Sequence, residues 1–145
     1  MSLKVLAIDD SRTMRNLLNA TLSAAGFEVD LAEDGEDGLR RFDQSDPDVI
    51  ITDINMPRLD GFGFIEGARD RTRERVVPIL VLTTESAPEM KARAKSAGAT
   101  GWIVKPFDEE KLVWAIERKV LCSTPLLRAF FWPISLCPCN KGKAD

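Results

Sequence analysis

Short apolar runs recur along this chain, and each run is bounded by polar or turn-forming residues. Every run has the length of a strand and is too short for an ordinary helix. A continuous apolar run is typical of a strand that is covered on both faces. The pattern therefore predicts five buried strands, at residues 3–8, 27–32, 48–52, 77–83 and 101–105.

The stretches between the predicted strands have the period of amphipathic helices. In the first stretch, apolar or small side chains recur on one helical face between residues 14 and 25. Four later helices are predicted at residues 35–44, 61–71, 87–97 and 108–121.

Capping residues mark several ends of these helices. Gly26 and Gly98 follow the first and fourth predicted helices, where glycine commonly adopts the left-handed conformation that ends a helix. Ser86 and Glu89 have the spacing of a capping box. This spacing predicts that the side chain of Ser86 caps the fourth helix.

Strands that alternate with helices favour a parallel sheet with right-handed crossovers. The predicted fold class is therefore a doubly wound α/β domain, and a chain of 145 residues suits one domain. We assign residues 1–121 to this domain. Residues 122–145 continue no alternation of strand and helix, and we expect them to form an irregular C-terminal extension.

Composition and charge exclude several classes of function. The net charge of −3 gives no basic surface for nucleic acid and no polybasic patch for a membrane. The N-terminus enters a strand pattern rather than a signal peptide. The apolar stretch of the extension is well short of the ~20 residues of a membrane span. We therefore expect a cytoplasmic protein with no membrane span and no nucleic-acid partner.

The chain contains no histidine, which removes histidine-dependent catalysis and the commonest metal ligand. Acid-base or metal chemistry therefore falls to carboxylates. Parallel strands bring their carboxyl ends to the same edge of a sheet. The polar side chains that follow the predicted strands are Asp9 and Asp10 after the first, Asp53 after the third, Thr83 after the fourth and Lys105 after the fifth.

Three carboxylates that converge repel one another and require a cation. Mg²⁺ prefers oxygen ligands and commonly completes its octahedron with water and phosphate oxygens. We expect Asp10 and Asp53 to bind Mg²⁺ directly and Asp9 to bind it through water. The carbonyl of Asn55 is placed to supply a further ligand. Once Lys105 balances the remaining negative charge, the free oxygen of Asp53 can attack phosphorus in line and form an acyl phosphate.

Each of these motifs, taken singly, has an ordinary structural explanation. An acidic pair before a helix is usually a cap, and a lysine before a proline is usually a solvated side chain at a turn. Their occurrence together, in order and each after a strand-like run, favours a functional site.

Four segments resemble the receiver domains of two-component response regulators, and especially CheY-like chemotaxis regulators. They are DDS at 9–11, DINMPRLDG at 53–61, VLTTE at 81–85 and VKPF at 104–107, and the resemblance covers residues 3–121. It implies a flavodoxin-like five-stranded parallel sheet of order 2-1-3-4-5 with five helices. It also implies a cis peptide bond between Lys105 and Pro106.

The resemblance implies a role for each residue that follows a strand. Asp53 would accept a phosphoryl group from a histidine kinase, with Mg²⁺ as the required cofactor. The hydroxyl of Thr83 would then move to the phosphoryl group, and the aromatic ring of Trp102 would fill the vacated space. The family has tyrosine or phenylalanine at the position of Trp102 more often than tryptophan.

The resemblance also implies residues that modulate the reaction and transmit its result. Asn55, Thr84 and Glu85 would flank the phosphoryl group and modulate its hydrolysis, although the family often has a smaller residue at the position of Thr84. The output surface would comprise the fourth helix, the fifth strand and the fifth helix. The helical period places Trp114 away from the core face of the last helix, where we expect it to contact a partner.

These observations predict a single-domain response regulator that takes phosphoryl groups from a histidine kinase and switches its affinity for a protein target. The resemblance suggests chemotaxis and the flagellar motor switch. The chain would phosphorylate and dephosphorylate itself and would not be an enzyme in the ordinary sense. Two alternatives stay open, a phosphate sink or shuttle for the kinase and an interaction module that acts through the extension. A metal-dependent phosphotransferase is disfavoured, because the predicted loops indicate no substrate pocket.

The extension has a distinct composition. Its three cysteines are one ligand short of a four-ligand zinc site, and they are Cys122, Cys137 and Cys139. Its aromatic residues at 130–132 are unfavourable in water. The extension could pack on the domain, pack on a partner or form a homodimer, or it could be an incidental C-terminus.

Overall fold

The structure is a computed structural model, and it describes residues 3–71 and 77–121. All five predicted strands are present in it. Their bounds are β1 (Lys4–Ile8), β2 (Glu28–Ala32), β3 (Val49–Thr52), β4 (Ile79–Thr83) and β5 (Gly101–Val104). The predictions for residues 122–145 lie outside the described residues.

The strands form one sheet of order β2-β1-β3-β4-β5, and every neighbouring pair is parallel. This confirms the predicted doubly wound α/β fold and the strand order that the family resemblance implies. The order changes direction at β1, because the chain adds β2 on one side of it and β3 on the other. In sheets of this kind, ligands bind beyond the carboxyl ends of the strands at this switch point.

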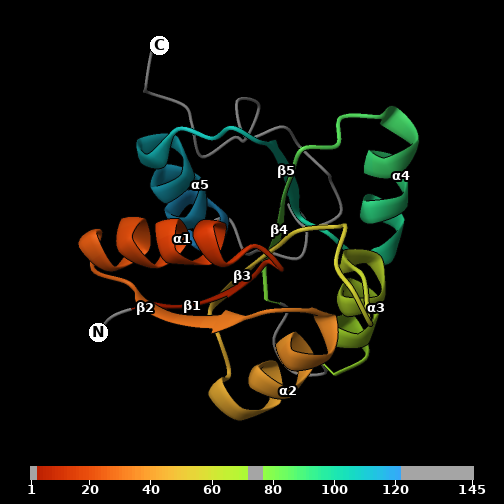
Figure 1. The fold of residues 1–145 in the computed structure, drawn as a ribbon, viewed down its shortest axis with the longest axis horizontal. Coiled ribbons are helices and arrows are strands. Elements are labelled where there is room, and N and C mark those ends of the chain that lie inside the picture. Colours follow the sequence, from red (N-terminus) through yellow and green to blue (C-terminus); the bar gives the residue numbers. More distant parts are fainter. Residues whose placement is uncertain (1–2, 72–76, 122–145) are drawn as a thin grey trace.

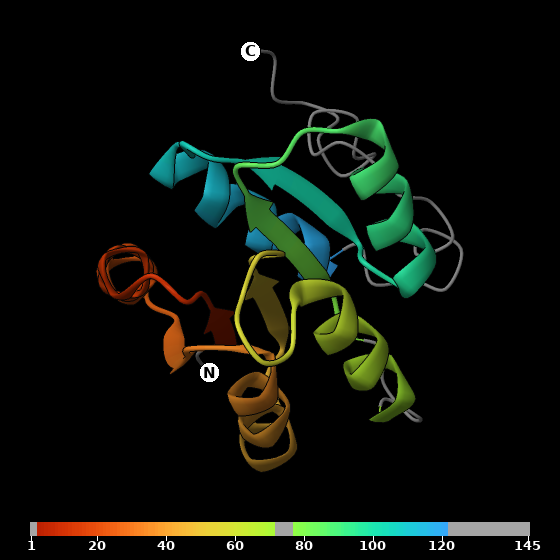
Figure 2. The ribbon, with the colours of Figure 1, turned by 45° about the vertical axis from the view of Figure 1, so that its right-hand side comes forward.

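Helices cover both faces of the sheet (Figures 1 and 2). α1 and α5 lie on one face, and α2, α3 and α4 lie on the other. Their bounds are α1 (Arg12–Ala24), α2 (Gly35–Ser45), α3 (Gly61–Arg71), α4 (Pro88–Ala97) and α5 (Glu109–Leu121). In the part of the chain that the structure describes, each helix is too short or too polar to cross a membrane.

Strand side chains alternate between two separate hydrophobic clusters. Leu6 and Ile8 of β1 face the cluster beneath α2, α3 and α4, whereas Val5 and Ala7 face the cluster beneath α1 and α5. Because both faces of the sheet are covered, a central strand can be apolar at every position. This packing explains the continuous apolar runs in the sequence.

Most predicted helix ends are confirmed, and one capping prediction is wrong. Gly26 and Gly98 follow α1 and α4 with φ angles of 93° and 116°. The N-cap of α4 is Ala87, which makes no side-chain capping hydrogen bond, and Pro88 begins the helix. Ser86 therefore lies one residue too early to act in a capping box. Proline suits the first helical position because the N–H that it lacks needs no partner there.

Candidate functional site

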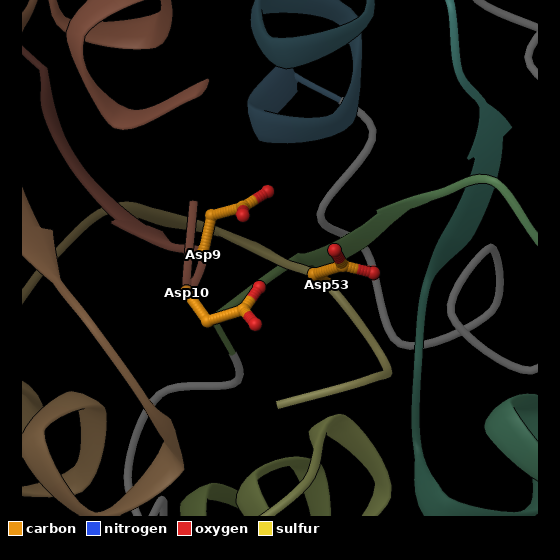
Figure 3. Close-up of side chains that lie close together, drawn as sticks. All are labelled: Asp9, Asp10 and Asp53. Atoms are coloured by element: carbon orange, nitrogen blue, oxygen red, sulfur yellow. The ribbon is translucent and has the colours of Figure 1, made fainter. Parts of the chain in front are cut away.

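Three carboxylates gather at the carboxyl edge of the sheet (Figure 3). Asp9 and Asp10 directly follow β1, and Asp53 directly follows β3, which pairs with β1. One oxygen from each carboxylate lies within 4.8 Å of an oxygen from each of the other two. Asp9 is buried, whereas Asp10 is exposed. The structure therefore brings together the three acids that the strand ends predict.

Local hydrogen bonds fix the position of Asp9. Its Oδ1 accepts from the backbone N–H of Ser11 at 2.8 Å, and its carbonyl accepts from Arg15 Nη1 at 2.6 Å. Ser11 caps α1, because its Oγ accepts from the backbone N–H of Met14 at 3.3 Å. The acidic pair is therefore not the cap of this helix.

Lys105 connects two of the acids. This lysine directly follows β5, and its Nζ donates to Asp9 Oδ2 at 2.8 Å and to Asp53 Oδ2 at 3.1 Å. Only 12% of the Lys105 side chain is exposed, so these contacts replace most of its hydration. The Lys105–Pro106 peptide bond is cis, as the resemblance implies. The ammonium group thus offsets part of the negative charge of the cluster.

Burial and charge shift the pKa values of this pair. Burial raises the pKa of Asp9 above its ordinary value, and the hydrogen bonds from Lys105 and Ser11 offset this shift only in part. Burial acts to lower the pKa of Lys105, but the hydrogen bonds and charges of Asp9 and Asp53 outweigh it, so this pKa is raised. Lys105 therefore stays protonated at neutral pH and can pair with an anion.

The loop after β3 fixes the orientation of Asp53. Asp53 Oδ1 accepts from the backbone N–H of Ile54 at 2.6 Å, and the Ile54 carbonyl accepts from the N–H of Gly61 at 2.9 Å. A Cβ atom at position 61 would lie 2.2 Å from the Asp53 carbonyl oxygen, so this close approach requires glycine. Asp53 Oδ2 is left facing Lys105.

A second group of side chains lies beyond β4 and β5. Thr83 is fully buried, and its Oγ1 accepts from the N–H of Glu85 at 3.4 Å. Trp102 is turned inward with 8% of its surface exposed, and its Nε1 donates to the Glu85 carbonyl at 3.0 Å. Asn55 Nδ2 donates to Glu85 Oε1 at 3.5 Å, and Thr84 is exposed. Glu85 therefore contacts the hydroxyl, the aromatic ring and the loop after β3.

Trp114 lies closer to the core than the helical period predicts. It is half-buried on α5 and packs against the hydrophobic cluster beneath α1 and α5. Leu112, Ala115 and Ile116 form the buried face of the helix, and the large ring of Trp114 reaches the cluster from the edge of that face. A role for Trp114 in partner binding stays a prediction.

Several supporting residues were not identified from the sequence. Arg15 belongs to no recognisable motif, and its contact is with the backbone carbonyl of Asp9, which no side-chain pattern predicts. Arg58 forms an ion pair with Asp34, with Nε and Oδ2 3.3 Å apart, between the loop after β3 and the start of α2. The position of Asp34 directly before a predicted helix is a signal that could have identified it as a cap.

The donor atoms of the acid cluster fit Mg²⁺. Opposite ligands in a Mg²⁺ octahedron lie about 4.2 Å apart, twice the usual metal–oxygen distance of about 2.1 Å. The carboxylate oxygens of Asp9, Asp10 and Asp53 lie within 4.8 Å of one another, and all are the hard oxygen ligands that this ion prefers. Small side-chain movements would bring them onto one ion.

Comparison with known proteins accounts for this arrangement. The response regulator receiver domain matches residues 5–117, a span that includes every site residue described above. The chain belongs to this family. Receiver domains of this family bind Mg²⁺ at an acidic site, which agrees with the cluster of three aspartates.

The receiver domain is similar to several named proteins over most of their length. It is 34% identical to protein PilG of Pseudomonas aeruginosa, over 86% of this chain and 92% of the relative. It is 38% identical to chemotaxis protein CheY1 of Helicobacter pylori, over 79% of this chain and 94% of the relative. The solved structure of chemotaxis protein CheY4 of Vibrio cholerae is 45% identical with a TM-score of 0.78, covering 81% of this chain and 98% of the other.

Proposed function

We propose that this receiver domain accepts a phosphoryl group from a histidine kinase on Asp53 and thereby changes its affinity for a protein target. The observation that best supports this function is the position of Lys105 Nζ, within hydrogen-bonding distance of both Asp9 Oδ2 and Asp53 Oδ2. A cation at that position can form an ion pair with a phosphoryl oxygen once the phosphoryl group is bonded to Asp53. The chemotaxis proteins CheY1 and CheY4 among the relatives support a role in chemotaxis.

Asp53 acts as the nucleophile in this proposal. The Ile54 N–H holds Asp53 Oδ1 at 2.6 Å, so Oδ2 is the oxygen that forms the bond to phosphorus. As this bond forms, the P–N bond of the kinase phosphohistidine breaks. The electron pair of the broken bond stays on the imidazole nitrogen, which takes up a proton. The product on the receiver domain is an acyl phosphate of Asp53.

Lys105 and the neighbouring acids prepare the site for the incoming group. Lys105 remains protonated because its pKa is raised, and it can exchange its bond to Asp53 Oδ2 for one to a phosphoryl oxygen. Asp9, Asp10, Asp53 and the carbonyl of Asn55 would hold Mg²⁺. When bound, Mg²⁺ would neutralise part of the negative charge on the oxygens of the transferred phosphoryl group.

The second group of side chains would transmit the change. The contact between Thr83 Oγ1 and the Glu85 N–H is long, at 3.4 Å, so the hydroxyl can exchange it for a shorter bond to the phosphoryl group. The Glu85 carbonyl also accepts a hydrogen bond from Trp102 Nε1. A movement of the segment that carries Thr83 and Glu85 would therefore displace both the ring of Trp102 and the start of α4. Asn55, Thr84 and Glu85 flank the phosphoryl position and would set the lifetime of the adduct.

The expected partners are a histidine kinase and a protein target that recognises α4, β5 and α5, including Trp114. The flagellar motor switch is the target that a chemotaxis role suggests. We place the protein in the cytoplasm, where the ATP that charges histidine kinases is found. Contacts through residues 122–145, including a homodimer, stay a prediction for solution measurements of mass.

Intact-protein mass spectrometry after incubation with acetyl phosphate tests the chemistry. We expect one phosphoryl adduct on the wild-type chain in the presence of Mg²⁺ and none in its absence. Asp53→Asn should form no adduct under either condition. Asp43→Asn is the matched control, since Asp43 is an exposed residue of α2 and the change in charge is the same. A wild-type chain that forms no adduct with Mg²⁺ would contradict the proposed function.

A second experiment separates a switch from a phosphate sink. Phosphoryl groups are transferred from a labelled histidine kinase, and binding of candidate targets is compared between the phosphorylated chain and Asp53→Asn. A target that binds the phosphorylated form more tightly supports the switch. Rapid return of phosphoryl groups to the kinase, with equal target binding by both forms, supports the sink instead.

A further inference from the structure

We propose that Arg58 is a positioning residue for the Mg²⁺ site and that it acts through the shape of the loop between β3 and α3. The group that it positions is the backbone carbonyl of Asn55. This inference rests on the proposed function, because Asn55 matters only if the acid cluster holds the metal. The ion pairs of Arg58 are formed with the start of α2, and the positioning effect proposed here passes through the loop.

The backbone of Arg58 adopts a conformation that is unusual for its residue type. Its φ angle is 65°, in the left-handed region that side chains other than those of asparagine and aspartate rarely adopt. The other non-glycine residue with positive φ in the described ranges is Asp46, whose short polar side chain tolerates it. A long side chain remains in this region only where its surroundings hold it there.

The start of α2 provides those surroundings. Arg58 Nε lies 3.3 Å from Asp34 Oδ2, and Arg58 Nη2 lies 3.9 Å from Glu33 Oε1. The Asp34 side chain is 1% exposed, and its Oδ1 caps α2 by accepting from the N–H of Asp37 at 2.8 Å. Buried charges in proteins are generally paired, and among the described residues Asp34 Oδ2 accepts no hydrogen bond, so Arg58 is its partner of opposite charge. The ion pair therefore constrains the loop, even though most of the Arg58 side chain is exposed.

A backbone hydrogen bond attaches the next loop residue to the same helix. The N–H of Gly35 donates to the Leu59 carbonyl at 3.0 Å, and a Cβ atom at position 35 would lie 2.4 Å from that oxygen. The loop thus lies against the first turn of α2, as both ribbon views show (Figures 1 and 2). At its other end, the loop is closed by the hydrogen bond between Gly61 and Ile54. Asn55 lies between these two attachments.

The segment that carries the Asn55 carbonyl has little conformational freedom. Only Asn55, Met56 and Pro57 separate Ile54 from Arg58, and the proline ring fixes one of the dihedral angles. A displacement of Arg58 therefore moves this short segment with it. Loss of the ion pair with Asp34 would free this segment from α2, shift the Asn55 carbonyl and so weaken Mg²⁺ binding.

Two simpler roles for Arg58 make different predictions. If Arg58 acted only as a charge, its removal would tighten Mg²⁺ binding, because a positive charge near the site repels the ion. If Arg58 only stabilised the fold, its removal would lower the free energy of unfolding without a specific effect on Mg²⁺. The proposed role predicts weaker Mg²⁺ binding at unchanged stability.

Arg58→Asn in the full chain tests these alternatives. Asparagine tolerates the left-handed conformation but is too short to replace the ion pair. Calorimetric titration with MgCl₂ should show an affinity about tenfold lower than that of the wild type. The urea midpoint of unfolding should stay equal or rise. Arg71→Asn is the matched control, because Arg71 pairs with exposed Asp43 on the neighbouring helix and the change in charge is the same.

Asp34→Asn removes the same ion pair by changing its other partner, which lies at the start of α2. Asparagine caps helices about as well as aspartate but lacks the charge that pairs with Arg58. This variant should also bind Mg²⁺ more weakly, and the double variant should lose no more affinity than either single variant. Equal or tighter Mg²⁺ binding by Arg58→Asn overturns the inference whatever Asp34→Asn shows, because the loss of a negative charge by itself weakens the binding of a cation. A wild-type chain that binds no Mg²⁺ overturns the proposed function along with it, so the two failures are distinguishable.

Discussion

Two halves of the site are built on different kinds of contact. We call the first the acid half, and it consists of Asp9, Asp10, Asp53 and Lys105. We call the second the hydroxyl half, and it consists of Thr83, Thr84, Glu85 and Trp102. In the acid half, charged groups meet at 2.8 and 3.1 Å, and backbone N–H groups hold carboxylate oxygens at 2.6 and 2.8 Å. In the hydroxyl half, Glu85 has contacts of 3.4 and 3.5 Å, and the bond from Trp102 is the short one at 3.0 Å.

The acid half also leads into a more closely packed helix than the hydroxyl half does. The acid half is followed by α3, in which Phe62, Phe64 and Ile65 are among five buried residues. The hydroxyl half leads into α4, where Ala94 is the buried residue and the N-terminus has no side-chain cap. Well-packed segments stay in place, whereas segments with few buried contacts move at low free-energy cost. The comparison indicates a rigid acid half and an adjustable hydroxyl half, which suits the roles of chemistry and transmission in the proposed function.

Lys105→Ala should produce the largest effect, because it removes the cation of the acid half. We expect adduct formation with acetyl phosphate to slow by about 100-fold or more, as for the loss of a preorganised charge in other active sites. Time-resolved intact mass measures the rate. Lys111→Ala is the control, since Lys111 is exposed on α5. A rate within a few-fold of wild type would mean that the acid half works without its lysine.

Trp102→Phe should produce the next largest effect, on stability rather than on chemistry. It removes the hydrogen bond to the Glu85 carbonyl and part of a buried ring, which should lower the free energy of unfolding by about 1–2 kcal/mol. Urea unfolding followed by circular dichroism measures this change. Adduct formation should stay within about threefold of wild type. A large loss of adduct formation would show that the two halves are not separable.

Thr83→Val should change stability by about 1 kcal/mol or less, because the valine keeps the shape of the buried side chain and the lost contact is long. The variant should still form the adduct. Its tryptophan fluorescence should no longer respond to the phosphoryl mimic beryllofluoride, because the hydroxyl that we propose as the link between the two halves is gone. Thr84→Val, at the exposed neighbouring position, is the control. A wild-type response in Thr83→Val would place the link elsewhere.

Glu85→Gln should produce the smallest effect on the fold. Its side-chain contact with Asn55 is 3.5 Å long, so we expect a change in stability of less than about 0.5 kcal/mol. The lifetime of the adduct is the sensitive measurement, and we expect a change of a few-fold in the rate of its decay. An unchanged decay rate would restrict the hydroxyl half to transmission.

The sequence predicted the acid half better than the hydroxyl half. Asp9, Asp10 and Asp53 follow continuous apolar runs, and parallel strands must bring such residues to one edge. The inward position of Trp102 and its bond to Glu85 depend on how β5 packs beside the loop after β4, which no local pattern encodes. The capping box at Ser86 was wrong for a related reason, because the spacing of two residues does not determine which residue begins a helix.

The ion pair between Arg58 and Asp34 also lay beyond sequence analysis. Its partners are far apart in the chain, and the left-handed backbone of Arg58 runs against the preference of its residue type. Such exceptions to local preference are expected where several parts of a fold fix one segment.

The contact between Lys105 and Asp9 joins residues that are 96 positions apart. Pairings of this kind form late in folding, because the entropy cost of ordering a long stretch of chain comes before the contact contributes any stabilisation. A nascent chain that has emerged only as far as β4 lacks this lysine and has an incomplete acid cluster. The complete cluster of three acids and one lysine therefore exists only after β5 has joined the sheet, so a partly made chain cannot carry the proposed chemistry.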